Sequence, residues 1–349
     1  MTDIDDVARR HAFHPLVVKQ VVEETDDTRT FVLDVPDDLA EAYRYRPGQF
    51  CTFRVQIGDA EHFRCYSMSS APETDPHLAV TVKCVPGGTV SNWFNDKVAV
   101  GDSVDTSPPS GKFCLRDGGR PLVGFCGGSG ITPVISLAKS ALVSTGRTVR
   151  LLYASREPTS VIFDEALRGL EAGSPDRLEV RRHFDSVSGF PRPAVVLDFV
   201  GAEPDADFYI CGPGPFMDVV EETLLGAGVA PGSILIERFV TPEPGGSSSV
   251  EASDDPVPAT IVLQVQGRRH EVAYHAGDTV LETARRAGLP APYSCEAGSC
   301  ATCMALLHEG SVSMRVNNAL TPDEVEEGWV LTCQSVPTSP SLRIEYEQL

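Results

Sequence analysis

The sequence predicts a multidomain chain made of an antiparallel β-barrel, an α/β unit on a parallel sheet and a smaller α+β unit. Three observations support this fold class. Short β-branched and aromatic segments follow one another up to about residue 117, strands then alternate with helices, and a segment rich in Pro, Ser and acidic residues precedes residue 259. We therefore divide the chain into residues 12–117, 118–240, 241–258 and 259–349.

The first unit is a succession of strands separated by Pro, Gly and Asp residues. Turns of this kind join antiparallel neighbours, so we expect a barrel or sandwich, and favour a barrel. The expected strands are residues 16–22, 30–35, 50–57, 62–69 and 78–85.

The second unit alternates strands with helices, the pattern of a parallel sheet covered by helices. The expected strands are residues 121–126, 148–155, 178–184, 207–211 and 233–239, and the expected helices are residues 132–144, 163–171, 194–200 and 215–225.

A linker and a small α+β unit follow. Residues 241–258 contain four prolines, four serines and four acids without a base, a composition that cannot repay the entropy of ordering. Beyond them we expect a hairpin of residues 259–265 and 270–275 that turns at Gly267 and Arg268. Thr279 and Glu282 have capping-box spacing, so a helix should begin there and end at Gly288.

Charge and hydropathy exclude several classes of partner. The 349-residue chain has 49 acidic and 29 basic residues and a formal net charge of −20, which disfavours nucleic acid and anionic membranes. Its first residues are acidic rather than basic, and no apolar run approaches the ~18 residues that span a bilayer. We expect a soluble, cytoplasmic protein without membrane insertion.

The ten cysteines give the most specific signal. Cys295, Cys300, Cys303 and Cys333 have the spacing C-x4-C-x2-C with a distant fourth cysteine, which is typical of a plant-type 2Fe-2S cluster. The alternative is a zinc site, which usually needs two C-x2-C pairs. The other cysteines lack ligand spacing: Cys51, Cys65, Cys84, Cys114, Cys126 and Cys211. Most should pack as small apolar residues, with Cys211 as the exception because it ends a strand directly before Gly212-Pro213-Gly214.

Two glycine-rich turns predict a nucleotide site. Gly127, Gly128, Ser129, Gly130 and Thr132 lie between an expected strand and helix, where backbone amides favour a pyrophosphate and Thr132 can cap the helix. Cys211-Gly212-Pro213 follows another strand of the same sheet. Carboxyl ends of parallel strands share one edge, and ligands bind there in open α/β sheets.

The barrel unit contains a third candidate site. Arg64 can pair with a phosphate, Tyr66 can stack on a flat ring, and the turn Gly87–Ser91 (Gly87, Gly88, Thr89, Val90, Ser91) can offer amides to a pyrophosphate. Taken singly, Tyr66 can equally be a core aromatic and Arg64 a surface ion-pair residue.

Together, Arg64-x-Tyr66-Ser67, the Gly87–Ser91 turn, the two glycine turns and the four-cysteine set resemble the ferredoxin–NADP reductase superfamily. The resemblance covers nearly the whole chain. The domain order resembles the reductase components of multicomponent oxygenases that end in a plant-type ferredoxin domain, most of all the reductases of 3-ketosteroid 9α-hydroxylases. It implies an FAD-binding β-barrel, an NAD-binding α/β domain and a β-grasp ferredoxin domain.

The resemblance also implies residue roles. Arg64 and Gly87–Ser91 would hold the FAD pyrophosphate, Tyr66 would stack on the isoalloxazine, and Ser67 would face flavin N5. Residues 127–132 would hold the nicotinamide dinucleotide, with Cys211, Gly212 and Pro213 beside the nicotinamide; Glu237 and Phe239 would approach the flavin or form an ordinary domain edge. We take Ser67, Cys211 and Glu237 as the candidate catalytic residues.

The implied function is electron transfer from NADH through FAD and the 2Fe-2S cluster to a terminal oxygenase, of the Rieske type and acting on steroids. NADPH stays open, because Arg156 stands where NADP-binding relatives carry basic residues. The alternatives are a reductase serving a diiron phenylacetyl-CoA epoxidase, an alkane hydroxylase or a cytochrome P450, and a redox sensor without turnover. We expect a monomer.

Overall fold

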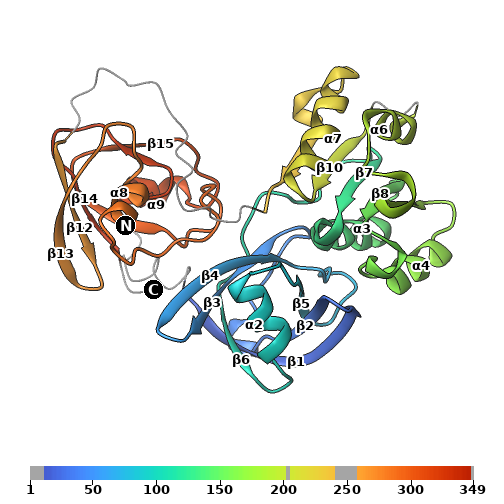
Figure 1. Cartoon of the computed structure of the whole chain (residues 1–349), viewed down its shortest axis with the longest axis horizontal. Coiled ribbons are helices and arrows are strands. Elements are labelled where there is room, and N and C mark those ends of the chain that lie inside the picture. Colours follow the sequence, from blue (N-terminus) through green and yellow to red (C-terminus); the bar gives the residue numbers. More distant parts are fainter. Residues whose placement is uncertain (1–11, 202–204, 240–257, 347–349) are drawn as a thin grey trace.

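The computed structural model describes residues 12–201, 205–239 and 258–346. Three bodies are visible in it, the barrel domain at the bottom of the view, the α/β domain on the right and the C-terminal domain on the left (Figure 1). The linker predicted over residues 241–258 lies, except for residue 258, outside the described residues.

The barrel domain is one antiparallel sheet in the order β4-β3-β6-β1-β2-β5. Met68, directly after β4, bridges Val80 of β5, so the two ends of this order meet and the sheet closes. Phe94 of α2 is fully buried against Phe31 and Phe53, with ring centroids 5.2 and 5.4 Å away. The elements are β1 (His14–Thr25), β2 (Thr28–Asp34), η1 (Asp37–Leu39), β3 (Phe50–Ile57), β4 (Ala60–Ser67), β5 (Leu78–Lys83), α2 (Thr89–Lys97) and β6 (Ser103–Thr106).

The α/β domain is a parallel sheet in the order β11-β10-β7-β8-β9, as the alternating pattern predicts. Helices α3 and α4 pack into the hydrophobic cluster on one side of the sheet, and α6 and α7 into the cluster on the other. The strands are β7 (Leu122–Gly127), β8 (Val149–Ser155), β9 (Leu178–Phe184), β10 (Asp207–Cys211) and β11 (Ile234–Glu237). The helices are η2 (Gly128–Gly130), α3 (Ile131–Ser144), η3 (Pro158–Ser160), α4 (Asp164–Gly173), α5 (Asp185–Ser188), α6 (Pro193–Val200), α7 (Gly214–Gly226) and η4 (Pro231–Ser233).

The C-terminal domain is a mixed sheet in the order β13-β12-β18-β14-β16, in which β12 and β18 are parallel. Val280, Leu281 and Ala284 of α8 are buried in the same core as the sheet, the arrangement of a β-grasp fold. The strands are β12 (Thr260–Val265), β13 (Arg268–Ala273), β14 (Met304–Glu309), β15 (Val312–Met314), β16 (Trp329–Leu331), β17 (Ser335–Pro337) and β18 (Arg343–Glu345), and the helices are α8 (Val280–Arg286) and α9 (Pro322–Glu326).

Local sequence signals in this domain have two outcomes. The capping box is confirmed, because Thr279 Oγ1 accepts from Glu282 N at 3.2 Å and Gly288 has φ +69° after the helix. The expected hairpin turn is wrong by one residue. Gln266 and Gly267 form it, both with positive φ, and Arg268 already pairs with Val265 in the ladder, as a two-residue hairpin turn requires.

Within these described ranges, no helix combines the length and apolar composition that crossing a lipid bilayer requires.

Candidate cofactor sites

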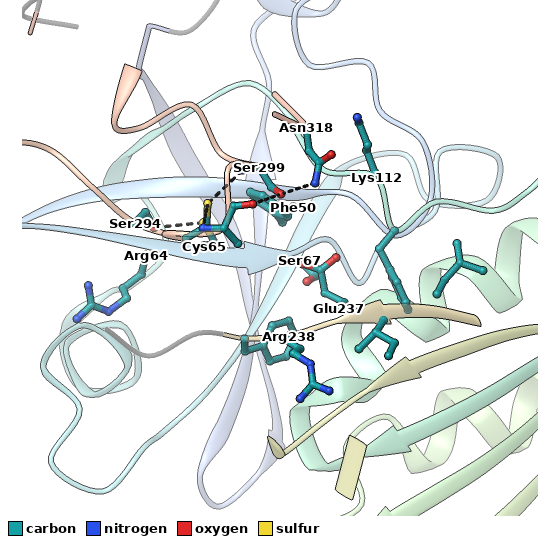
Figure 2. Close-up of a pocket in the computed structure, with 16 residues that line it drawn as sticks. Phe50, Arg64, Cys65, Ser67, Lys112, Glu237, Arg238, Ser294, Ser299 and Asn318 are labelled. Atoms are coloured by element: carbon teal, nitrogen blue, oxygen red, sulfur yellow. Dashed lines mark hydrogen bonds between the residues drawn. The ribbon is translucent and has the colours of Figure 1, made fainter. Parts of the chain in front are cut away.

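A cavity of about 530 Å³ lies where the three domains meet, and we name it the three-domain cavity. The barrel contributes β4 residues and Lys112, the α/β domain contributes the chain around Glu237, and the C-terminal domain contributes Ser294, Cys295 and Ser299. Figure 2 shows these side chains converging from separate ribbons. A group bound here touches all three domains at once.

Strand β4 presents Arg64, Cys65 and Ser67 to this cavity. Arg64 Nη1 donates to Phe63 O at 2.7 Å, and its guanidinium has no carboxylate partner among the described residues, so a cation is available for a phosphate. Ser67 is buried at the end of β4. Ser67 and Glu237 both line this cavity (Figure 2).

Tyr66 packs in the barrel core and also borders a cavity. Its ring packs edge-on against Phe94 at 5.4 Å and near Phe53 at 5.7 Å, so one side belongs to the barrel core. The same side chain lines a second cavity of about 180 Å³, which we name the α2 cavity, together with Arg64, Ser67 and residues 88–91. The ring of Tyr66 is thus shared between the barrel core and the wall of the α2 cavity.

The segment Gly87–Ser91 is a turn followed by the first residues of a helix, and not the single turn that the sequence predicts. Gly87, with φ +72°, and Gly88 form the turn, whereas Thr89, Val90 and Ser91 already belong to α2. Ser91 Oγ is occupied, because it accepts from Val85 N at 3.2 Å. What remains for an anion is the amino end of α2, whose first backbone amides have no partner within the helix.

The two glycine turns of the α/β domain contact each other. Because β7 and β10 are adjacent and parallel, their carboxyl ends lie side by side. A Cβ at Gly130 would lie 2.0 Å from Cys211 O, and one at Gly212 would lie 2.9 Å from Gly127 N. Gly130 and Gly212 therefore allow the two turns to pack closely, because a side chain at either position would clash. Gly128 has open space around it, and glycine is favoured there because its φ is +52°.

Thr132 does not cap α3 as predicted. The helix begins at Ile131 after Gly130, and Thr132 Oγ1 donates to Ser129 O at 2.9 Å. The short η2 turn brings the chain into the helix one residue early, so Thr132 is already helical. Ser129 and Thr132 nevertheless line the α2 cavity, as does Phe239.

Cys211 and Glu237 are paired neighbours on adjacent strands, β10 and β11, and Cys126 of β7 is the partner of Cys211 on its other side. Burial, followed by the charge of Glu237, raises the pKa of the Cys211 thiol well above its usual range, so it stays a neutral thiol. Burial raises the pKa of Glu237 to about 7, which makes it a carboxyl able to hold a proton near neutrality. Glu237 lines the three-domain cavity.

The four cysteines of the predicted cluster lie in two pairs. Cys295 N donates to Cys300 Sγ at 3.4 Å, and the neighbouring side chain of Cys333 raises the pKa of the Cys303 thiol. In the described part of the chain, no three His, Cys, Asp or Glu side chains converge on one ion. A structural zinc needs four ligands around one ion, whereas each iron of a binuclear cluster takes two thiolates, so this donor set fits 2Fe-2S better.

Residues 294–303, which we name the cluster loop, aim backbone amides at sulfur. Ala297 N and Ser299 N each lie 3.4 Å from Cys295 Sγ, and Cys295 N lies 3.4 Å from Cys300 Sγ. The small residues of the loop permit this approach, and such bonds stabilise the more negative reduced state. The residues present therefore fit the cluster.

Sequence reasoning missed several residues of the site. Lys112 and Asn318 line the three-domain cavity, and Ser110 Oγ donates to Ser299 O at 2.6 Å. Nothing in their sequence context marks them, because they come together only when the domains meet.

Among the remaining cysteines, the packing prediction is confirmed for Cys51, Cys114 and Cys126, which are buried; Cys211, the expected exception, is buried as well. It is wrong for Cys65, which is partly exposed and lies 3.2 Å from Ser294 Oγ of the cluster loop. Cys84 is also partly exposed.

Comparison with domain families agrees with this division of roles. An oxidoreductase FAD-binding domain matches residues 15–114, an oxidoreductase NAD-binding domain matches residues 125–222, and a 2Fe-2S iron-sulfur cluster binding domain matches residues 263–338. Fold and site thus define an NAD(P)H-dependent oxidoreductase that carries FAD and a 2Fe-2S cluster.

Whole-chain relatives specify the family. The sequence is 40% identical to the ferredoxin reductase component of 3-ketosteroid-9-alpha-monooxygenase from Mycobacterium tuberculosis, over 95% of this chain and 96% of that protein. A component of the 1,2-phenylacetyl-CoA epoxidase from Escherichia coli is 31% identical over 96% of this chain and 98% of its own length. The chain belongs to the family of ferredoxin reductase components of multicomponent oxygenases.

A solved structure has the same architecture from end to end. Phthalate dioxygenase reductase, described as a modular structure for electron transfer from pyridine nucleotides to 2Fe-2S, is 25% identical, with a TM-score of 0.59 over 96% of this chain and 98% of that one. The predicted fold class, the cofactors and the function as an oxygenase reductase component are confirmed.

Proposed function

We propose that this chain passes electrons from NADH through FAD and the 2Fe-2S cluster to the terminal oxygenase of a steroid 9α-hydroxylating system. One observation supports electron transfer from FAD to the cluster within the chain. Ser67, Glu237 and Cys295, which come from the three domains, all line the three-domain cavity. FAD, when bound, accepts a hydride and releases electrons one at a time, which a nicotinamide cannot do.

In this proposal each domain holds one group. Arg64 and the amino end of α2 hold the FAD pyrophosphate, Tyr66 stacks on the flavin ring, and Ser67 lies against it. Glu237, which keeps a proton near neutrality, holds that proton at its carboxyl group beside the flavin. Residues 127–132 and 211–213 bind the nicotinamide dinucleotide, and Cys295, Cys300, Cys303 and Cys333 bind the irons.

NADH is the proposed donor because Arg156 is engaged. Its Nη2 lies 2.8 Å from Asp27 Oδ2 of the barrel domain, and Asp27 also pairs with Lys83 at 2.6 Å. An arginine that binds a carboxylate is less free to bind the 2′-phosphate of NADPH.

The steroid system is favoured over the epoxidase because the former relative is 40% and the latter 31% identical. The acceptor surface is proposed on the C-terminal domain, where residues 259–349 carry eleven acids and six bases. Docking to a basic patch predicts reduction rates that fall with salt. We also propose that the protein is a cytoplasmic monomer, which sedimentation and cell fractionation test.

The experiment is reconstitution with candidate oxygenases. The purified holoprotein is mixed with NADH and either a steroid 9α-hydroxylase oxygenase or a diiron phenylacetyl-CoA epoxidase, and product formation is followed. The proposal expects turnover with the former. Turnover only with the epoxidase supports the alternative, and NADH-reducible cofactors without turnover of any acceptor, cytochrome c included, support the sensor.

A further inference from the structure

Cys65 is the residue of strand β4 that meets the cluster loop. Its Sγ lies 3.2 Å from Ser294 Oγ and 3.4 Å from Thr52 Oγ1. Cys65 also lines both the three-domain cavity and the α2 cavity. It therefore borders the space assigned to the flavin and contacts the cluster loop at Ser294 at the same time (Figure 2).

Ser294 directly precedes Cys295 in the cluster loop, so its contact with Cys65 fixes the loop beside a proposed iron ligand. In the same loop, Ala297 N and Ser299 N donate to Cys295 Sγ. Hydrogen bonds donated to a cluster sulfur stabilise the reduced, more negative cluster and raise its reduction potential. Releasing the loop from β4 should therefore weaken the bonds that raise this potential.

We propose that Cys65 is a positioning residue for electron transfer between the flavin and the cluster, holding the cluster loop against β4 through its hydrogen bond with Ser294. The inference rests on the proposed internal route from FAD to 2Fe-2S and adds the residue that couples the two sites. It assigns no covalent chemistry to the thiol.

The first test compares Cys65→Ala with Cys65→Ser in the full-length holoprotein. Cys84→Ser is the control, because Cys84 is also partly exposed but lines neither of the two cavities. Anaerobic rapid mixing with NADH gives the rates of flavin and cluster reduction, and a redox titration followed by electron paramagnetic resonance gives the cluster potential.

We expect Cys65→Ala to lower the cluster potential and to slow cluster reduction about tenfold, the effect of one hydrogen bond. Cluster reduction should slow more than flavin reduction by NADH. Cys65→Ser, which retains a donor, should restore most of the potential, and Cys84→Ser should match the wild type. A Cys65→Ala protein with wild-type potential and wild-type cluster reduction overturns the inference, as does an equal slowing of flavin reduction.

The second test does not depend on removing Cys65. In Ser294→Cys, two thiols face each other across the domain contact, and oxidised glutathione can take up two electrons and two protons as they form a disulfide. We expect this internal link, detected by mass spectrometry, and none in the double variant Cys65→Ser with Ser294→Cys. Two free thiols after oxidation of the folded holoprotein contradict the contact.

The two proposals fail differently. A wild-type protein in which NADH reduces neither flavin nor cluster refutes the proposed function. A wild-type protein that reduces both, with a Cys65→Ala variant indistinguishable from it, refutes only the role of Cys65.

Discussion

The barrel domain meets its two neighbours through interfaces of different chemistry. Toward the α/β domain, the buried Ser136 hydroxyl donates to Ser70 O at 2.6 Å, and Lys139 Nζ bonds both Ser69 O at 3.3 Å and Asp75 Oδ2 at 3.1 Å. Ser140 and Glu73 form a further hydrogen bond in this contact. Buried and charged groups thus fix the two domains together.

The contact between the barrel and the C-terminal domain is made by smaller groups around open space. Ser110 Oγ donates to Ser299 O, and Cys65 meets Ser294. Cavities of about 340 and 440 Å³, in addition to the three-domain cavity, lie along this contact. Hydroxyl and thiol contacts can be broken and remade more cheaply than a buried, charged interface.

The difference between the two interfaces matches the reactions that they serve, which are hydride transfer on one side and electron transfer on the other. Hydride transfer needs reacting atoms about 3–3.5 Å apart with fixed orientation, so the domains that hold the nicotinamide and the flavin must be rigidly joined. The C-terminal domain must receive an electron and then offer it to another protein. A contact made of weaker, more easily broken interactions suits electron transfer to a second protein.

The largest expected effect comes from a variant that disrupts only the cluster of the C-terminal domain. Cys333→Ser removes one of the two thiolates paired at Cys303 and Cys333, so the cluster should be lost or altered. NADH-dependent cytochrome c reduction should fall more than about tenfold. Ferricyanide reduction, measured in the same preparation as the control, should stay near the wild-type rate if ferricyanide takes electrons from the flavin. Equal loss of both activities would mean that the domains do not act separately.

The next effect concerns the junction of the two interfaces, where Glu237 has a pKa of about 7. The folded protein keeps this proton up to about pH 7, while the unfolded chain releases it near 4.5, so ionisation opposes folding and stability falls as pH rises between these values. Glu237→Gln should remove this loss, worth up to about 3 kcal/mol.

The measurement is the difference in urea stability between Glu237→Gln and the wild type at pH 5 and pH 8. Relative to the wild type, the variant should have a higher free energy of unfolding at pH 8 than at pH 5. A difference that does not depend on pH would show that Glu237 ionises normally.

A matched pair of serine variants sharpens the comparison further. Ser136→Ala leaves Ser70 O without its buried donor and should cost about 1–3 kcal/mol in urea unfolding. It should also slow flavin reduction by NADH, read by stopped-flow absorbance. Wild-type stability and wild-type flavin reduction together would argue against a tightly fixed interface.

The smallest expected effect is that of Ser110→Ala on the other side. The hydroxyl group of Ser110 is only partly buried, so the free energy of unfolding should fall by about 0.5–1.5 kcal/mol. Cluster reduction should slow severalfold while flavin reduction stays unchanged, in the same stopped-flow traces. If Ser110→Ala slows flavin reduction more than Ser136→Ala does, the contrast between the interfaces is wrong.

Features encoded in short stretches could be predicted from the sequence. The capping box of Thr279 and Glu282 and the parallel sheet depend on local spacing or periodicity, and the structure contains both of them. The 2Fe-2S domain, predicted from the spacing of the cysteines, is found by comparison with domain families. Errors fell at boundaries. Thr132 and the Gln266-Gly267 turn are displaced by one residue because a 3-10 turn and a two-residue hairpin shift the register without changing the pattern.

Contacts between domains could not be predicted in this way. Cys65 looks like a strand cysteine, and only the approach of Ser294, 229 positions later, gives it a partner. Lys112 and Asn318 likewise become site residues through tertiary placement alone. No periodicity carries such information, because each residue is locally compatible with many surroundings.

The most direct test of the central claim is anaerobic mixing of the holoprotein with NADH, with flavin absorbance and the electron paramagnetic resonance signal of the cluster followed in one experiment. The shared cavity predicts that the flavin bleaches first and the cluster signal then appears within the same chain, at a rate independent of protein concentration. A cluster that stays oxidised while the flavin is fully reduced, or that is reduced only in proportion to protein concentration, would contradict it.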